Sequence, residues 1–203
     1  MKIKSLIVCL GFILLFVFSH AQNFTAVQNL INRQFPAMKD KVILNKIKFN
    51  GYDSAHYISS KNKLTIYANT GNAAAYALYD YVKKYCFSSL SHTGDNINIP
   101  SVLPATNKKE NITAVFPLRY ALNYCTYNYT MSFWKWEDWE KELDWMALNG
   151  VNLMLTQMGT EEVWQKTLSE FGFSDNDIRA FIPGPAFNAW WLMGNLQGWG
   201  GPV

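Results

Sequence analysis

Apolar and polar residues alternate along the chain in patterns that predict two successive groups of helices and strands. Asn23–Phe35 has apolar residues at helical spacing, and Pro36 ends the run. Ala55–Ser59 and Leu64–Ala68 alternate as short strands, with Asn62 in the turn between them. This first group therefore begins with a helix and a hairpin.

A second helix completes the first group. Ala73–Tyr85 carries apolar residues at spacings of three and four, which predicts an amphipathic helix. Residues 88–112, which include Pro100 and Pro104, form a polar connector with at most one short strand. We expect a small α/β unit in which helix covers one side of the strands.

The second group begins after this connector. Leu118–Cys125 is predicted to be a buried strand, and Ser132 is predicted to cap the helix that follows. The apolar positions of that helix lie three and four residues apart, at Trp136, Trp139, Leu143 and Met146. Asn149-Gly150 ends it, because glycine adopts the left-handed conformation at little cost.

A further strand and two helices follow. Val151–Thr156 is predicted to be a strand and Glu161–Phe171 a helix, and Ser174-x-x-Asp177 is typical of a capping box before a short third helix. Strand and helix in alternation predict a parallel sheet. Residues 113–203 are only 91 residues, whereas a (β/α)₈ barrel needs about 250. We therefore expect a truncated barrel.

Tryptophan and charge divide the chain in the same way. All eight tryptophans lie at or after Trp134. Residues 22–112 hold 11 Lys and Arg against 5 Asp and Glu, whereas residues 113–203 hold 5 against 10. We therefore expect two domains, at 22–112 and 113–203. The lysines are scattered, so nucleic-acid binding has little support.

The first 21 residues have the pattern of a signal peptide. Lys2 and Lys4 precede the apolar run Leu6–Phe18, and Ser19-His20-Ala21 supplies small residues at the two positions that a signal peptidase reads. The run is short for a membrane span, although an uncleaved anchor is the alternative. We expect export to the periplasm or the cell exterior, or to a lysosome in a eukaryote, without stable membrane insertion after cleavage.

Signal removal leaves two cysteines, Cys86 and Cys125, one in each predicted domain. One disulfide is possible in an exported protein, but a chain of this size does not need it, so we favour two free thiols. No histidine lies in the second domain, which disfavours a cysteine–histidine nucleophile. No His, Cys or Asp residues show the spacing of metal ligands.

Polar and aromatic residues follow both strands of the second domain. Residues 123–127 and 157–162 come at the carboxyl ends of the predicted strands, where barrel active sites lie. Their Asn and Tyr side chains are suited to hydrogen-bonding sugar hydroxyls. Glu161 and Glu162 are poor candidates for a glycosidase pair, because neighbours on a helix diverge by about 100°. Carboxylates in a first helical turn also favour the helix dipole.

Two further features have ordinary structural interpretations. The acidic run Glu137–Asp144 is predicted to be a solvated helix face. Packing is favoured over stacking on sugars for four tryptophans, namely Trp136, Trp139, Trp145 and Trp164.

Residues 119–126, 139–153 and 184–202 form three sequence blocks that resemble the alpha-N-acetylglucosaminidases, family 89 of the glycoside hydrolases. Residues 119–126 resemble the family pattern RYYxNxCT, and residues 139–153 resemble WExExDWMALNGxNL. Residues 184–202 are similar to GPAFxAWxxMGNLxxWxGP. The blocks occur in the same order over about 85 residues. Before Thr113 the resemblance is weaker.

The resemblance implies a fold, an activity and a set of site residues. It implies a small N-terminal α/β domain followed by the first βα units of an incomplete (β/α)₈ TIM barrel. The implied activity is hydrolysis, with retention, of terminal alpha-linked N-acetylglucosamine from heparan sulfate or other host glycans, and no cofactor is implied. The implied substrate-binding residues are Asn123, Cys125, Trp190 and Met193. No residue of this chain matches either catalytic glutamate.

Two hypotheses follow. The first is a fragment of an exported glycosidase that is inactive alone. The second is a non-catalytic carbohydrate-binding module, which would be a compact monomer that binds N-acetylglucosamine.

Overall fold

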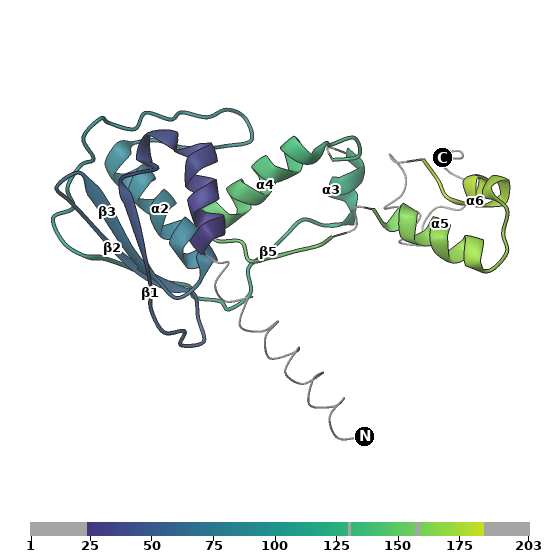
Figure 1. Ribbon diagram of the computed structural model, residues 1–203, viewed down its shortest axis with the longest axis horizontal. Helices are drawn as coiled ribbons and strands as arrows, with labels where there is room; N and C mark the ends of the chain where they lie inside the picture. The colour runs from purple at the N-terminus through teal and green to yellow at the C-terminus, as the bar shows by residue number, and fades with distance from the viewer. Residues whose placement is uncertain (1–23, 130, 157–158, 185–203) are drawn as a thin grey trace, which may run out of the picture. The chain divides into compact units, whose positions relative to one another are not determined.

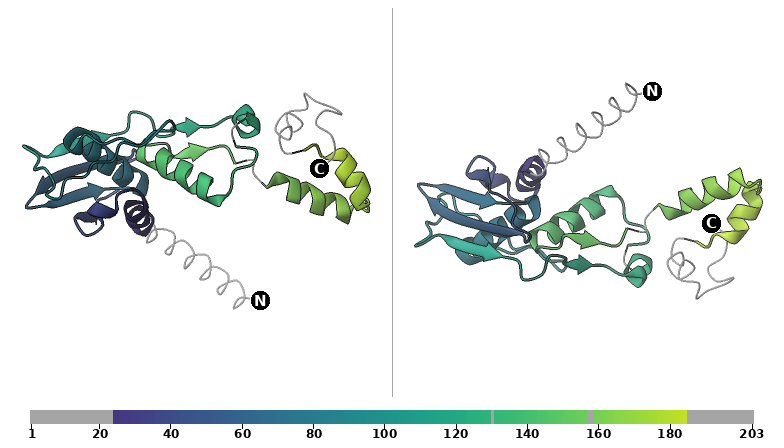
Figure 2. Two further views of the ribbon diagram at one scale, coloured as in Figure 1. Left: turned by 90° about the horizontal axis from the view of Figure 1, so that it is seen from above. Right: turned by 90° about the horizontal axis from the view of Figure 1, so that it is seen from below.

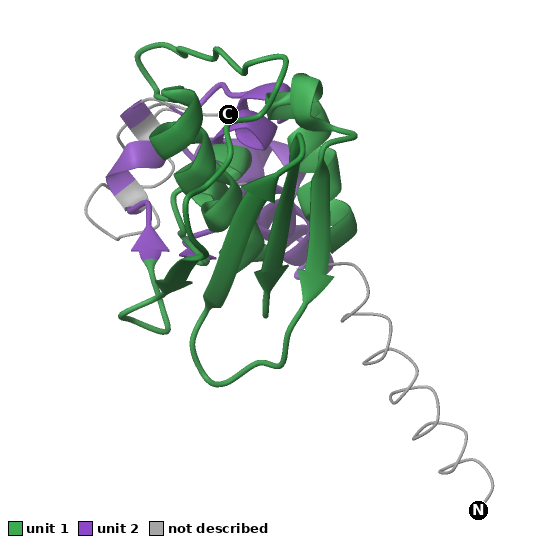
Figure 3. Cartoon of the chain, turned by 90° about the vertical axis from the view of Figure 1, so that its left-hand side faces the viewer, with its two compact units in different colours: residues 1–119, 143–152 green, residues 120–142, 153–203 purple. Residues whose placement is uncertain are grey.

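The computed structural model describes residues 24–129, 131–156 and 159–184. These residues divide into two compact units, coloured separately in Figure 3. Unit 1 holds residues 24–119 and 143–152, and unit 2 holds residues 120–142 and 153–184. The domain boundary expected near residue 112 stays a prediction.

Unit 1 contains a four-stranded sheet in the order β1-β3-β2-β4. Its strands are β1 (Val42–Lys46), β2 (Ser54–Ser60), β3 (Lys63–Ala68) and β4 (Glu110–Thr113). β1 and β3 are parallel, whereas β2 pairs antiparallel with both β3 and β4. Every second side chain of β2 and β3 is buried, which gives the sheet one core face.

The predicted hairpin is confirmed by the turn between β2 and β3. Lys61 and Asn62 have positive φ angles of 48° and 60°. Two consecutive left-handed residues make a turn whose twist matches that of the flanking strands. Asparagine tolerates this conformation better than most residues, which explains its place in the turn.

Helices cover the core face of the sheet, as Figures 1 and 3 show. Residues 24–34 form the first helix, followed by the 3₁₀ turn η1 (Pro36–Met38), and α2 (Gly71–Cys86) packs on β2 and β3. Thr70 caps α2 by accepting a hydrogen bond from the backbone of Ala73. Both predicted helices of this unit are confirmed.

Unit 2 contains a short parallel pair of strands and three further helices. Their bounds are β5 (Tyr120–Ala121), α3 (Tyr124–Tyr129), β6 (Leu153–Met154), α5 (Thr160–Glu170) and α6 (Asp175–Phe181). The parallel pairing of β5 and β6 confirms the predicted sheet type. α5 and α6 lie side by side in Figures 1 and 2.

The predicted buried strand at Leu118–Cys125 is wrong in length and burial. Leu118 and Tyr120 are exposed, and the strand ends at Ala121. Leu122 then takes a φ angle of +70°, which no strand accommodates. Asn123 caps α3, so local capping replaces strand pairing. The second predicted strand, Val151–Thr156, is likewise reduced to β6.

Helix α4 (Trp136–Leu148) differs from prediction at its start. Ser132 lies four residues before the helix and donates a hydrogen bond to the carbonyl of Tyr127. Asp138 instead accepts from the backbone N–H of Lys135, at 3.0 Å. The helix ends as predicted, since Gly150 follows it with a φ angle of +81°.

The acidic run on α4 is only partly a solvated face. Glu137 and Asp138 are exposed, whereas Glu142 and Asp144 are each 5% exposed. Asp144 accepts hydrogen bonds from Arg33 at 2.6 and 2.9 Å and from Gln34 at 3.0 Å. The prediction is wrong at both buried carboxylates, Glu142 and Asp144. At Asp144 the charge is balanced by partners far away in sequence.

The last two helices follow the sequence prediction. α5 matches the predicted helix to within one residue at each end. Ser174 and Asp177 form the expected capping box before α6. Among the residues that the structure describes, no helix combines the length and apolar composition that crossing a bilayer requires.

Candidate functional site

Asn123 lies at the start of α3, two residues after β5. Its Oδ1 accepts hydrogen bonds from the backbone N–H and the hydroxyl of Thr126, at 3.1 and 3.0 Å. The side chain is exposed, and the capping bonds use only its oxygen. The carboxamide nitrogen is therefore a suitable donor for a sugar oxygen, with its orientation fixed by the cap.

Cys125 lies in the first turn of the same helix and is half-buried. Cys86 is buried in α2, and burial raises the pKa of its thiol. Both cysteines are free in the structure. The structure thus places two of the four predicted substrate-binding residues on one helical turn. The other two, Trp190 and Met193, lie outside the described residues.

Glu161 and Glu162 are both in the first turn of α5, as the helix-start interpretation predicts. Glu162 pairs with Lys166 at 2.6 Å on the exposed surface, and this hydrogen bond lowers the pKa of the carboxyl group. A glycosidase general acid needs a raised pKa. Both glutamates border one hollow of about 270 Å³ between α5 and α6. The lowered pKa of Glu162 nevertheless makes this carboxyl group a poor general acid.

The tryptophans differ in how far they pack. Trp139 stacks on Tyr127 with ring centroids 5.8 Å apart and meets Trp134 edge-on at 5.0 Å. Trp145 contacts the ring of His92 at 4.2 Å. These contacts support packing for Trp139 and Trp145. Trp136 is 64% exposed, so packing is the wrong interpretation for that residue.

Tyr127 is the exception among the buried polar side chains. It is 3% exposed, and its hydroxyl has no hydrogen-bond partner among the described residues. Burial raises the pKa of this phenol to about 12. Sequence analysis missed this feature, because nothing in the spacing of aromatic residues shows which hydroxyl lacks a partner.

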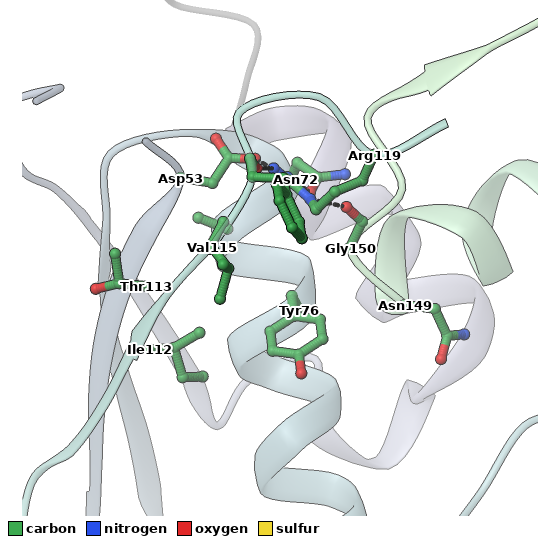
Figure 4. Close-up of a pocket in the computed structure, with 12 residues that line it drawn as sticks. Asp53, Asn72, Tyr76, Ile112, Thr113, Val115, Arg119, Asn149 and Gly150 are labelled. Atoms are coloured by element: carbon green, nitrogen blue, oxygen red, sulfur yellow. Dashed lines mark hydrogen bonds and ion pairs between the residues drawn. The ribbon is translucent and has the colours of Figure 1, made fainter. Parts of the chain in front are cut away.

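Sequence analysis also missed the environment of Arg119, which Figure 4 shows beside a pocket in unit 1. Its guanidinium makes five hydrogen bonds. Nε donates to the carbonyl of Gly150 at 2.5 Å, and Nη1 donates to the carbonyls of Phe116 and Pro117 at 2.8 and 3.3 Å. Nη2 donates to the Asn72 side chain at 3.0 Å and to the Asp53 carboxylate. All five N–H groups are therefore in use.

The pocket beside Arg119 has a volume of about 370 Å³. The Tyr76 ring and the side chains of Ile112 and Val115 border it in Figure 4. The polar groups around Arg119 already have partners, since Asp53 accepts from the Thr70 hydroxyl at 2.7 Å and Asn72 donates to the Val151 carbonyl at 2.6 Å. Arg119 therefore organises this region rather than binding a ligand. The sequence did offer one indication that Arg119 matters, because this residue is the first of the block 119–126 that carries the family resemblance.

Among the described residues, no group of three or more His, Cys, Asp or Glu side chains is arranged to hold a metal ion. The chemistry that these residues offer is hydrogen bonding to a polar ligand, from the turn that holds Asn123 and Cys125.

Two family models match this chain, and both describe domains of alpha-N-acetylglucosaminidase. Residues 25–105 match the model of the alpha-N-acetylglucosaminidase (NAGLU) N-terminal domain. Residues 119–203 match the model of the alpha-N-acetylglucosaminidase (NAGLU) TIM-barrel domain. The first domain and the start of the barrel therefore follow each other in the order that the sequence predicts.

Individual relatives agree with the family models. Human alpha-N-acetylglucosaminidase is 38% identical over 141 residues, which are 70% of this chain and 19% of the human protein. A family 89 glycoside hydrolase from Clostridium perfringens, solved with 2-acetamido-1,2-dideoxynojirmycin, is 40% identical with a TM-score of 0.85. The same values hold for a structure of the Clostridium perfringens protein with its substrate GlcNAc-alpha-1,4-galactose.

These solved structures match 92% of this chain, and the match covers 22% of theirs. The chain thus spans about a fifth of the length of the relatives it resembles.

Proposed function

The chain belongs to the alpha-N-acetylglucosaminidase family, family 89 of the glycoside hydrolases, and from that membership we propose that it contributes the amino-terminal domain and first barrel units of a hydrolase for terminal alpha-linked N-acetylglucosamine. The observation that carries this proposal is the match to a structure solved with GlcNAc-alpha-1,4-galactose, at 40% identity over 92% of the chain. Hydrolysis proceeds with retention in this proposal.

In this proposal Asn123 and Cys125 supply one wall of the sugar pocket. The exposed carboxamide of Asn123 is held by its cap on α3, so it binds a sugar oxygen with little further loss of side-chain entropy. The half-buried thiol of Cys125 adds an adjacent surface of low polarity. The family resemblance implies that Trp190 and Met193, which lie outside the described residues, also bind the sugar.

The 203-residue chain does not turn over substrate alone. No residue in it matches a catalytic glutamate of the family, and glycoside hydrolysis needs two carboxylates flanking the scissile bond. We expect no release of nitrophenol from a nitrophenyl alpha-N-acetylglucosaminide by the purified chain. Turnover that copurifies with the chain through successive columns would contradict this part of the proposal.

A chimera tests the family function directly. Residues 25–203 replace the matching segment of the Clostridium perfringens enzyme, and proton NMR follows hydrolysis of GlcNAc-alpha-1,4-galactose. We expect hydrolysis with the alpha anomer of N-acetylglucosamine as the first product.

Asn123→Ala in that chimera should lower kcat/KM by about 10- to 100-fold, the cost of leaving a polar substrate group unpaired. Asn111→Ala, at an exposed asparagine on β4, is the matched control and should leave kcat/KM unchanged. A folded chimera that binds the disaccharide without hydrolysing it would favour the carbohydrate-binding module instead.

Export is the second part of the proposal. The basic residues, the apolar run and the small residues before Gln22 support cleavage of residues 1–21 and release outside the cytoplasm. Amino-terminal sequencing of the protein from its producing cell should begin at Gln22. A protein that keeps Met1 and stays with the membrane fraction would show the uncleaved anchor.

A further inference from the structure

Two residues, one before each strand of the β5–β6 pair, bind each other through backbone and side chain. Arg119 immediately precedes β5, and Asn152 immediately precedes β6. The backbone N–H of Arg119 donates to Asn152 Oδ1 at 2.9 Å, and the backbone N–H of Asn152 donates to the Arg119 carbonyl at 3.1 Å. Asn152 Nδ2 also donates to the carbonyl of Pro117 at 2.9 Å.

The Arg119 guanidinium ties the same two segments together a second time. It binds the carbonyl of Gly150, two residues before Asn152, and the carbonyls of Phe116 and Pro117 on its own segment. Asp53 and Asn72 fix this guanidinium from the loop before β2 and from the start of α2. The approach to both strands is therefore held by one fully bonded arginine (Figure 4).

The strands themselves contribute little to their own alignment. Their register consists of two residue pairs, Tyr120 with Leu153 and Ala121 with Met154. A slip by one residue would shift one strand by about 3.3 Å and turn its side chains to the opposite face. Asn123 follows β5 by two residues, so a slip would carry its carboxamide away from its place.

We propose that Arg119 and Asn152 form a register lock, which aligns the first two barrel strands and thereby positions Asn123 for the glycan. Arg119 and Asn152 are positioning residues in this inference, and they do not touch the substrate. The inference rests on the proposed function only for the identity of the ligand at Asn123. The alignment itself is a property of the chain.

Cross-linking of cysteine pairs measures the alignment without any glycan. The 203-residue chain carries Cys9, Cys86 and Cys125 replaced by serine. One version adds Tyr120→Cys with Leu153→Cys, the pair in register. A second version adds Tyr120→Cys with Met154→Cys, the pair that a one-residue slip brings together. The ratio of the two oxidation rates reports the register.

We expect the in-register pair to dominate in the parent chain. Arg119→Lys keeps the charge but loses the forked hydrogen bonds, and should move the ratio about tenfold toward the slipped pair. Arg33→Lys is the matched control, because Arg33 also holds a buried carboxylate, Asp144, at 2.6 Å, and that carboxylate belongs to α4 and not to either strand approach. An unchanged ratio in Arg119→Lys, or an equal change in Arg33→Lys, overturns the lock.

If circular dichroism shows that the Arg119→Lys chain is unfolded, Asn152→Asp is used in the same cross-linking experiment. It keeps the acceptor for the Arg119 backbone and loses the donor to Pro117, so it should move the ratio in the same direction by a smaller factor. A folded Asn152→Asp chain with the parent ratio overturns the proposal.

The chimera then separates this inference from the proposed function. Arg119→Lys should lower kcat/KM, and Asn123→Ala should cost less in that background than alone, because the two residues act through one contact. If Arg119→Lys changes the cross-linking ratio but the chimera is inactive, the proposed function is contradicted and the register lock is still supported. Full additivity of the two substitutions in an active chimera overturns the positioning role.

Discussion

At the scale of single residues, two buried tyrosines show opposite ways of placing a hydroxyl in a protein interior. The Tyr81 hydroxyl donates to the carbonyl of Pro104 at 2.7 Å and lies 3.2 Å from the Ser59 hydroxyl. The Tyr127 hydroxyl has no such partner among the described residues. A buried polar group without a partner lowers stability by its desolvation cost, whereas a paired group recovers that cost.

Removing each hydroxyl should therefore have opposite effects. We expect Tyr127→Phe to leave the free energy of unfolding unchanged or raise it by up to about 1 kcal/mol, since no hydrogen bond to a described residue is lost. Tyr81→Phe, the control, should lower it by about 1–2 kcal/mol because the Pro104 carbonyl loses its donor. Urea denaturation of both variants gives the comparison. A Tyr127→Phe chain as unstable as Tyr81→Phe would reveal a partner for the Tyr127 hydroxyl.

Single residues also mark where prediction from sequence ends. Asp144 belongs to a run of acidic side chains, and local composition gives no reason to separate it from Glu137. What buries it is the pairing with Arg33, which lies 111 residues earlier. A long-range partner of this kind leaves no local pattern, so the exposed-face prediction failed there and held at Glu137.

At the scale of secondary-structure elements, tight turns and most helix ends were predictable, whereas the start of α4 and the strand lengths were not. The capping box at Ser174 and the turn at Asn62 depend on side chains next to the backbone that they organise. The length of a strand depends on pairing with residues elsewhere. Leu122 and Asn123 end β5 by starting α3, and the apolar run from Leu118 did not show that.

The end of α4 offers a test of one close approach between elements. A Cβ placed on Gly150 would lie 3.1 Å from Cδ2 of Tyr76, which belongs to α2. Gly150→Ala should lower the free energy of unfolding by about 1–2 kcal/mol for the positive φ alone, and by more for the contact. Thermal and urea denaturation measure the loss.

Gly172→Ala is the control for backbone strain. Its φ angle of +86° is close to the +81° of Gly150, and a Cβ there meets nothing within 4 Å. The difference between the two alanine variants therefore isolates the contact with Tyr76. Equal losses would mean that α2 and the end of α4 adjust without cost.

At the scale of the whole molecule, the core of unit 1 contains three buried tyrosines, Tyr57, Tyr79 and Tyr81. Tyr57 donates to Asp80 at 2.8 Å, and Lys84 binds the same carboxylate at 2.8 Å. Burial raises the pKa of Tyr57 and raises that of Tyr81 to about 12, and the hydrogen bond to Asp80 raises the pKa of Lys84. In each case the folded chain holds its proton more tightly than the unfolded chain.

The sign of the pH dependence follows. Stability from these groups is complete below their unfolded pKa values, near 10, and is lost as the pH rises through the folded values. We expect the free energy of unfolding to fall above pH 10, by up to about 1.4 kcal/mol per pH unit for each group. Urea denaturation at pH 8, 9, 10 and 11 measures it. Tyr81→Phe should give a shallower fall, and a curve rising above pH 10 would contradict the tyrosine assignment.

The fold class was accessible from the sequence because alternating strands and helices and the three sequence blocks agree with each other. The arrangement around Arg119 was not, because it joins a loop, a helix start and a turn that lie up to 97 residues apart along the chain. The ion pair between Asp53 and Arg119 also has a consequence for sequence variation among relatives. A mutation of Asp53 leaves a partly buried positive charge without its carboxylate partner, so we expect relatives that lose the aspartate to lose or rebalance the arginine as well. Substitutions at Asp53 and Arg119 should therefore occur together when sequences of the family are compared.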